Sequence, residues 1–117
     1  ILSSRNFLDL NRGWAEGNPE DAARFMRALV EATDFIAANP DESAKLVGEF
    51  ISMDAEFAKK LMPKIDFDIL LDKQDTVEYL TPIEAKLKSG GRLTKDIAWD
   101  RYIYPAVIET VLPDKVK

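Results

Sequence analysis

The chain has 117 residues, of which 46% are hydrophobic and 32% are charged, and it carries a formal net charge of -5. This length supports one buried core and is too short for two ordinary domains, so we expect a single segment over residues 1–117. The acidic balance disfavours nucleic acid or an anionic membrane as a partner. The sequence has no Cys and no His, so it lacks thiolates and the usual general base and transition-metal ligand. We therefore expect a non-enzymatic protein without a cofactor or a metal site.

The N-terminal residues, Ile1 to Arg5, have the pattern of a short strand. A lone strand leaves backbone N–H and C=O groups unpaired, so we expect it either to pair with a strand outside this sequence or to fray. Because Ile1 is not Met and no signal segment is recognisable, we expect a processed product or a piece of something longer. A short helical segment or turn is predicted next, over residues 7–15.

Two similar signals then mark the starts of consecutive helices. They are Asn18-Pro19-Glu20-Asp21 and Asn39-Pro40-Asp41-Glu42. Asn is a preferred N-cap, Pro fits the first helical position, and acids in the first turn complement the positive end of the helix dipole. The two signals predict helices over residues 19–38 and 40–52.

The apolar pattern predicts which faces of these two helices are buried. Polar residues at positions 20, 24, 27, 31 and 34 form one exposed stripe on the first helix. The side chains expected to face inward on that helix are Ala22, Phe25, Met26, Leu29, Val30, Ala32, Thr33 and Ile36. On the second helix they are Ala44, Val47, Phe50 and Ile51. Gly48 weakens the middle of that helix, which favours close packing against a neighbour there.

Three helical segments are predicted in the rest of the chain. The first begins at the N-cap Asp54 and is limited by Pro63, and residues 66–68 then form a connector. The second covers residues 75–88, with a kink or a restart at Pro82, and the third covers residues 106–112. The whole pattern predicts a mainly α protein with five or so helices and one short N-terminal strand.

Several residues admit a binding role, and for each of them a structural role is favoured. Trp14 could stack on a ligand, but we expect a core or lid aromatic. Phe25 and Met26 could line a cofactor, but we expect core packing. The aromatic tail with Trp99, Tyr102 and Tyr104 could be a binding patch, but we expect it to pin the C-terminal arm to the body.

Two short motifs are weak signals for ion or phosphate binding. Asp66-Phe67-Asp68 lacks the ligand spacing and the Gly of an EF-hand loop, so solvated loop charge is favoured. Ser89-Gly90-Gly91 lacks the strand-to-helix surroundings of a phosphate loop, so it is expected only to end a helix. Acids follow both Asn18 and Asn39, which argues against an anion site at either helix start.

The order of these features resembles a known family. It runs from the strand-like residues 1–7 through Asn18-Pro19-Glu20 and a long helix to residues 32–44, Ala-Thr-Asp-Phe-Ile-Ala-Ala-Asn-Pro-Asp-Glu-Ser-Ala. This succession is similar to the C-terminal part of the solute-binding proteins of ABC importers of the nitrate/sulfonate/taurine type, which also resemble thiamine-precursor binding proteins. The resemblance is best over residues 1–52, and Pro82 and the aromatic tail depart from the family pattern.

The resemblance implies a two-lobed α/β fold of the periplasmic type II class, of which this chain is a C-terminal fragment. It implies non-catalytic binding of a small solute, delivery to an ABC permease, and a periplasmic or extracellular membrane-anchored location. The ligand-binding residues stay unknown, because in that family the pocket is built mainly from the remaining portion. We also expect the isolated chain to self-associate. The alternative is a free-standing acidic helical domain whose aromatic tail docks a protein partner.

Overall fold

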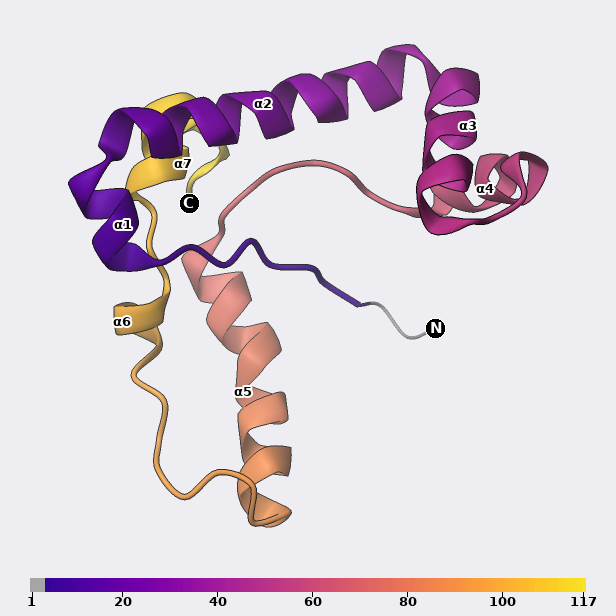
Figure 1. Cartoon of the computed structure of the whole chain (residues 1–117). Coiled ribbons are helices and arrows are strands. Elements are labelled where there is room, and N and C mark those ends of the chain that lie inside the picture. Colours follow the sequence, from indigo (N-terminus) through magenta and orange to yellow (C-terminus); the bar gives the residue numbers. More distant parts are fainter. Residues whose placement is uncertain (1–3) are drawn as a thin grey trace. The chain divides into compact units, whose positions relative to one another are not determined.

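The computed structural model describes residues 4–117 and is mainly helical, as predicted (Figure 1). Within this described part there are seven α-helices and no strand. The helices are α1 (Arg12–Gly17), α2 (Pro19–Ala38), α3 (Pro40–Ile51), α4 (Ala55–Leu61), α5 (Lys73–Ser89), α6 (Trp99–Tyr102) and α7 (Ala106–Val111). Two 3-10 turns, η1 (Met62–Lys64) and η2 (Pro113–Lys115), follow α4 and α7.

The predicted N-terminal strand is wrong for the part of it that can be assessed. Its first residues, 1–3, lie outside the described residues, and residues 4–11 have no regular secondary structure. Arg5 is held by side chains in place of a backbone ladder. Its guanidinium forms an ion pair with Asp75 and lies 4.6 Å from the ring centroid of Tyr79. The Phe7 ring also lies near Tyr79, with the two centroids 6.1 Å apart.

The chain divides into two compact units. The first contains the described residues up to Arg24 together with Leu71–Lys117, and the second contains Phe25–Leu70. In the first unit, the C-terminal residues lie along the start of α5. The N–H of Leu71 donates to the carbonyl of Lys115 at 2.9 Å, and the N–H of Lys117 donates to the carbonyl of Leu71 at 2.9 Å. Leu71 and Val116 thereby form an isolated parallel bridge.

The helix starts at Pro19 and Pro40 were predicted correctly, but the Asn side chains act differently from the prediction. Asn39 makes no side-chain cap to α3, and its amide donates to the carbonyl of Phe35 at 3.2 Å. The Asn18 amide likewise donates to the carbonyl of Trp14, at 3.0 Å. Each Asn therefore closes the preceding helix, satisfying one of the carbonyls that a helix end leaves unpaired.

A tight corner between α3 and α4 organises the second unit, where the two helices lie side by side (Figure 1). Ser52 has a left-handed backbone (φ 55°) and its N–H donates to the carbonyl of Gly48. The same carbonyl accepts the N–H of Met53 at 2.8 Å. Gly48 is needed there, because a Cβ on it would lie 2.7 Å from the carbonyl oxygen of Met53. The predicted close packing at Gly48 is confirmed.

The core of this unit is small. It consists of buried Ala44, Ala58 and Met62, against which Ile36, Val47, Met53 and Phe67 pack while remaining partly exposed. The inward-facing prediction holds for Ala22, Met26 and Ala44 but is wrong for four other residues. Phe25, Ala32 and Ile51 are exposed, and Phe50 is 91% exposed. Within the second unit, these apolar residues of α2 and α3 are therefore left uncovered.

Two further sequence predictions differ in detail. A continuous helix α5 passes through Pro82 without a restart, and it begins at Lys73, two residues earlier than predicted. The hydroxyl of Thr81 donates to the carbonyl of Val77 at 2.7 Å, which supplies a side-chain hydrogen bond in the turn where Pro82 has no N–H to donate. Helix α6 was not predicted, and α7 ends at Val111 before Pro113 as expected.

Asp54 caps α4, and its removal provides a first testable result. Its Oδ1 accepts the N–H of Phe57 at 3.0 Å. Asp54→Ala is expected to lower the free energy of unfolding by about 1 kcal/mol, because that N–H at the helix start loses its partner. Urea unfolding followed by circular dichroism measures the change. Asp54→Asn is the matched control and should stay close to the parent, since Asn caps equally well; equal loss in both variants would contradict the capping role.

Candidate functional site

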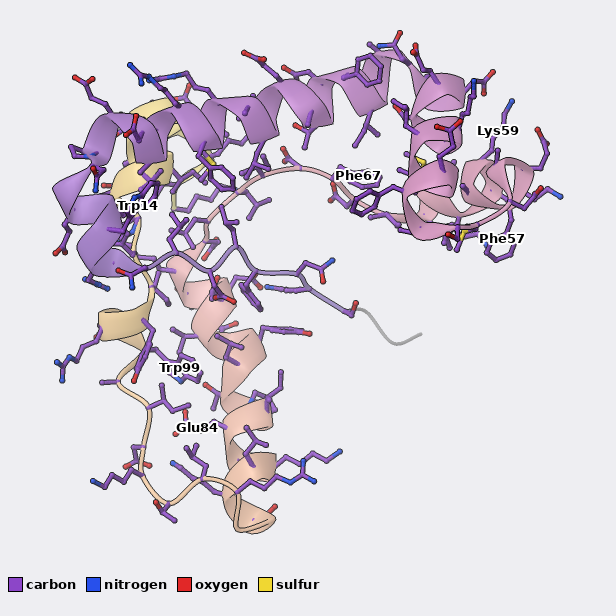
Figure 2. All side chains as sticks on the ribbon, in the orientation of Figure 1. Trp14, Phe57, Lys59, Phe67, Glu84 and Trp99 are labelled. Carbon is purple, nitrogen blue, oxygen red and sulfur yellow. The ribbon has the colours of Figure 1, made fainter. Side chains whose placement is uncertain are left out.

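The second unit contains two adjoining hollows that share Ile36, Ala37 and Phe67. One has a volume of about 420 Å³ and the other about 330 Å³. Figure 2 marks Phe67 in the segment that returns from α4 toward α5. The larger hollow is lined mostly by apolar side chains, and we call it the apolar groove.

Local sequence signals explain how the apolar groove is built. Its walls are Ile36, Ala37, Pro40, Asp41, Lys59, Met62, Pro63, Ile65 and Phe67. Pro40 begins α3 directly after the end of α2, and Pro63 stops α4 and turns the chain into η1. This turn leaves Met62 buried in the core and Ile65 43% exposed at the groove. The groove therefore forms where two proline-limited helix ends meet.

One ion pair lies at the rim of the groove. The Lys59 ammonium is 2.7 Å from the Asp41 carboxylate, and this hydrogen bond raises the pKa of Lys59 above its ordinary value. Figure 2 shows Lys59 on α4. Both side chains are at least half exposed, so the pair links α4 to the start of α3 but adds little stability.

The second hollow carries carboxylates along its wall. Asp34, Asp66 and Asp68 line it with Thr33. The Thr33 hydroxyl donates to the carbonyl of Val30 at 2.8 Å, and Asp66 Oδ1 accepts the N–H of Asp68 at 2.9 Å. These contacts are local turns of the chain. In the described part of the sequence, no group of three or more acidic side chains is arranged to hold a metal ion.

In the first unit, Glu84 on α5 forms hydrogen bonds with the segment that follows this helix. Its carboxylate accepts the N–H of Ile97 at 3.1 Å and the indole N–H of Trp99 at 2.9 Å, and the Lys88 ammonium lies 2.7 Å away. The Lys88 hydrogen bond and then the Ile97 N–H lower the pKa of Glu84. Lys88 also pairs with Asp96, which lowers the pKa of that carboxyl. Figure 2 shows the Glu84 and Trp99 side chains between α5 and the tail.

We call residues 93–104 the strap. Trp99 and Tyr102 pack edge to face, with centroids 6.5 Å apart, and Arg12 lies 4.8 Å from the centroid of Tyr104. Arg12 also donates to the carbonyl of Arg101. Tyr102 is 72% exposed. Trp99 therefore attaches the strap to α5 and Tyr104 attaches it to α1, whereas Tyr102 faces solvent.

The other residues considered from the sequence are not brought together in one site. Trp14 in α1 is 42% exposed, and Phe25 is 44% exposed while its neighbour Met26 is buried. Gly90 and Gly91 end α5, because their N–H groups donate to the carbonyls of Lys86 and Lys88 at 3.1 and 3.0 Å. These N–H groups are used within the chain, so they do not form a phosphate cradle.

The sequence analysis predicted neither the apolar groove nor the attachment of the strap to Glu84. The groove joins residues from 36 to 67 that share no motif, although Pro40 and Pro63 were available as signals for its two edges. The Glu84–Trp99 hydrogen bond joins residues fifteen positions apart, across the turn that follows α5.

The chemistry of the larger hollow suits an apolar group more than a charged solute, because its floor is aliphatic and aromatic and its rim cation is already paired. None of the α-helices in the described residues has the length and apolar character of a membrane span. Comparisons with protein-family models, with curated proteins and with solved structures found no match to this chain.

Proposed function

We propose that the chain is the C-terminal helical part of an ABC-importer solute-binding protein of the nitrate/sulfonate/taurine type. In this proposal it belongs to a two-lobed type II fold and covers part of one lobe. The complete protein binds a sulfonate, taurine, nitrate or thiamine-precursor solute and delivers it to an ABC permease, outside the cytoplasmic membrane. The proposal rests on the family resemblance and is supported by the amount of apolar surface that the chain leaves uncovered.

The observation that best supports the proposal is the solvent-accessible area of the chain. The chain exposes 9140 Å². Two separate compact bodies with the masses of the two units would expose about 7,700 Å² in total by the usual scaling of area with mass. The chain therefore exposes about 1,400 Å² more surface than two fully separate compact bodies of these masses would expose. The exposed large apolar residues include Phe25, Phe35 and Phe50.

The long helix α2 illustrates this uncovered surface. Phe25, Ala28, Ala32 and Phe35 follow one another at spacings of three and four residues, which places them on one side of the helix. All four are exposed. A helix that is apolar on this side as well as on its buried side is typical of one packed between two layers. A β-layer from the rest of a solute-binding protein would supply the second layer.

In this proposal the solute pocket lies outside the present chain. Acids follow the starts of both α2 and α3, and they disfavour an anion at either helix N-terminus. The apolar groove offers no unpaired cation on its floor for a sulfonate or nitrate. Binding of such anions is therefore assigned to the remainder of the protein.

The proposal predicts that the isolated chain does not bind these anions, and this can be measured directly. Taurine, an alkanesulfonate or nitrate at millimolar concentration is expected to leave the thermal unfolding midpoint unchanged, because a ligand stabilises only a state that binds it. Differential scanning fluorimetry with sodium chloride as the ionic-strength control measures this. A dose-dependent rise in the midpoint with one of these anions would contradict the placement of the pocket.

The coding sequence upstream of Ile1 tests the transporter proposal itself. We expect a signal peptide followed by about two hundred residues of alternating strands and helices, enough for the remaining lobe structure. An upstream stop codon with a start at this point, or an unrelated upstream domain, would contradict the proposal.

A free-standing helical interaction domain is the second candidate function. It is favoured by the 72% exposure of Tyr102 on the strap, because exposed Tyr is common at protein interfaces. The pinning of Trp99 by Glu84 reduces the aromatic surface available there. This alternative predicts a stable monomer at high concentration, whereas the fragment proposal predicts self-association.

A further inference from the structure

Phe67 belongs to both hollows of the second unit. The apolar groove and the hollow of about 330 Å³ share it with Ile36 and Ala37. The Phe67 side chain also packs against the small buried core of this unit, so the core holds it in place. A ligand that lies in the apolar groove and extends past Phe67 would therefore enter the second hollow. The two hollows can serve as the two halves of one site.

The second hollow differs from the apolar groove in its charge, and we call it the acidic hollow. Asp34, Asp66 and Asp68 line it, and no cation is among the described residues of its lining. Asp66 and Asp68 flank Phe67 in the sequence, and Asp66 Oδ1 accepts the N–H of Asp68 at 2.9 Å. The acidic hollow therefore carries negative charge directly beside the aromatic residue that it shares with the groove.

The one cation among the described residues that line the two hollows does not offset this charge. It is Lys59, whose ammonium lies 2.7 Å from the Asp41 carboxylate at the rim of the apolar groove. The pair is neutral in itself, so the carboxylates of the acidic hollow remain in excess. Acidic residues also outnumber basic ones in Phe25–Leu70 as a whole. A cation is attracted to this part of the surface, and an anion is repelled.

The apolar groove and the acidic hollow together match an organic cation with an apolar body. The groove has a volume of about 420 Å³, which is in the range of small-molecule pockets, and Ile36, Met62 and Phe67 suit an aliphatic or aromatic group. An ammonium group beside Phe67 would face carboxylates and the negative face of the ring. A metal ion is a poorer match, because the described carboxylates form no group of three arranged to hold one.

We propose that this chain binds a monovalent organic cation, with its apolar body in the apolar groove and its ammonium group in the acidic hollow. The whole site lies within the second unit. The proposal does not depend on the transporter role, because the solute pocket of that role is assigned to the remainder of the protein.

Four ligands separate the contributions of the two halves. Phenylbutylammonium has the apolar body and the cation, phenylbutanol has the same body without charge, phenylbutyrate has it with a negative charge, and ethylammonium has only the cation. Amide chemical shifts of the isotope-labelled chain should give phenylbutylammonium a dissociation constant on the order of 1 mM, with shifts at Ala37 and Phe67. The other three should bind about threefold more weakly or worse. Equal affinities for phenylbutanol and phenylbutylammonium, or shifts outside the two hollows, would overturn the proposal.

Removal of two carboxylates tests the acidic hollow. Asp34→Asn combined with Asp66→Asn should weaken phenylbutylammonium binding about fivefold and leave phenylbutanol binding unchanged. The fold is preserved, because an amide oxygen at position 66 can still accept the N–H of Asp68. Glu31→Gln combined with Glu49→Gln is the matched control, since both residues are exposed and lie outside the two linings. Equal weakening in both double variants would contradict a local site, because net charge alone would then explain it.

Ala37→Phe tests the wall that the two hollows share. Ala37 is exposed near the end of α2 and lines both hollows, so a phenyl ring there fills their junction without entering the core. Binding of phenylbutylammonium should fall about tenfold or more, as for loss of a well-packed contact. Ala38→Phe, at the exposed neighbouring position outside both linings, should bind like the parent. Undiminished binding by Ala37→Phe with native circular dichroism would place the ligand elsewhere and refute the proposal.

Discussion

Gly48→Val is expected to lower the free energy of unfolding of this chain by about 3 kcal/mol, at the upper end of the cost of overpacking. A Cβ at this position would lie 2.7 Å from the carbonyl oxygen of Met53 and 3.4 Å from the Cα of Ala55. Both contacts are with backbone, which cannot rotate away as a side chain would. The corner between α3 and α4 must then open, and the small core of Ala44, Ala58 and Met62 loses its packing.

The control for this substitution is Gly17→Val at the end of α1. A Cβ there would meet nothing within 4 Å, and Gly17 is exposed, so the change should stay within about 0.5 kcal/mol of the parent. Urea denaturation monitored by far-ultraviolet circular dichroism compares the two variants. Similar stabilities for Gly48→Val and Gly17→Val would contradict the close approach at the corner.

Glu84→Gln is expected to release the strap from α5. The neutral amide loses the charge that Lys88 contacts at 2.7 Å. The N–H of Ile97 and the indole N–H of Trp99 donate to different oxygens of Glu84, and the single oxygen of Gln can accept from only one of them. Hydrogen exchange of the Ile97 amide should become about tenfold faster or more, since bonds to charged acceptors are the stronger ones. In a Trp14→Phe background, the emission of Trp99 should also shift to longer wavelength as the indole is exposed to water.

Glu78→Gln is the matched control, because Glu78 lies on the same helix and accepts a hydrogen bond only from Gln74 of α5, at 2.8 Å, among the contacts described here. It should leave both the Ile97 exchange rate and the Trp99 emission unchanged. Unchanged exchange in Glu84→Gln itself would mean that Glu84 does not hold the strap.

The Glu84 contacts also give the strap a pH dependence of defined sign. Lys88 and the Ile97 N–H lower the pKa of Glu84 in the folded state, and Lys88 lowers the pKa of Asp96. A carboxyl with a lowered folded-state pKa contributes stability above its unfolded pKa, and this contribution is lost as the pH falls through the folded pKa. The strap should therefore loosen on acidification, and the part of this transition due to Glu84 should be missing in Glu84→Gln.

Local signals were sufficient to predict most of the helices. Proline at the first helical position and acids in the first turn located the starts of α2 and α3, and Asp54 located the start of α4. These signals depend only on residues within one helical turn, so they identify a helix start without knowledge of how the rest of the chain packs. The mainly α class followed from them, whereas the use of Asn18 and Asn39 to close the preceding helices could not be distinguished from N-capping by residue type alone.

Contacts between distant residues could not be predicted in the same way. Helix α6 has no side-chain N-cap, and its first residue Trp99 is held by Glu84 from α5. The exposure of Phe50 was also unpredictable, because an apolar helix position indicates a covered face without indicating which molecule covers it. The apolar groove likewise depends on how three segments meet, which no spacing in the sequence encodes.

The proposed relation to solute-binding proteins and the uncovered apolar surface predict different experimental results. The first predicts an upstream coding sequence of strands and helices. The second predicts that one copy of the chain is not the smallest stable particle at high concentration.

Sedimentation equilibrium of the unmodified chain is the most direct measurement of this central expectation. The mass of one copy is 13.2 kDa. We expect the weight-average mass to rise above this value as the concentration increases, because the exposed apolar faces of α2 and α3 are covered on association. A mass that stays at 13.2 kDa up to the highest concentration would show that a single copy tolerates these faces in water and would contradict the account.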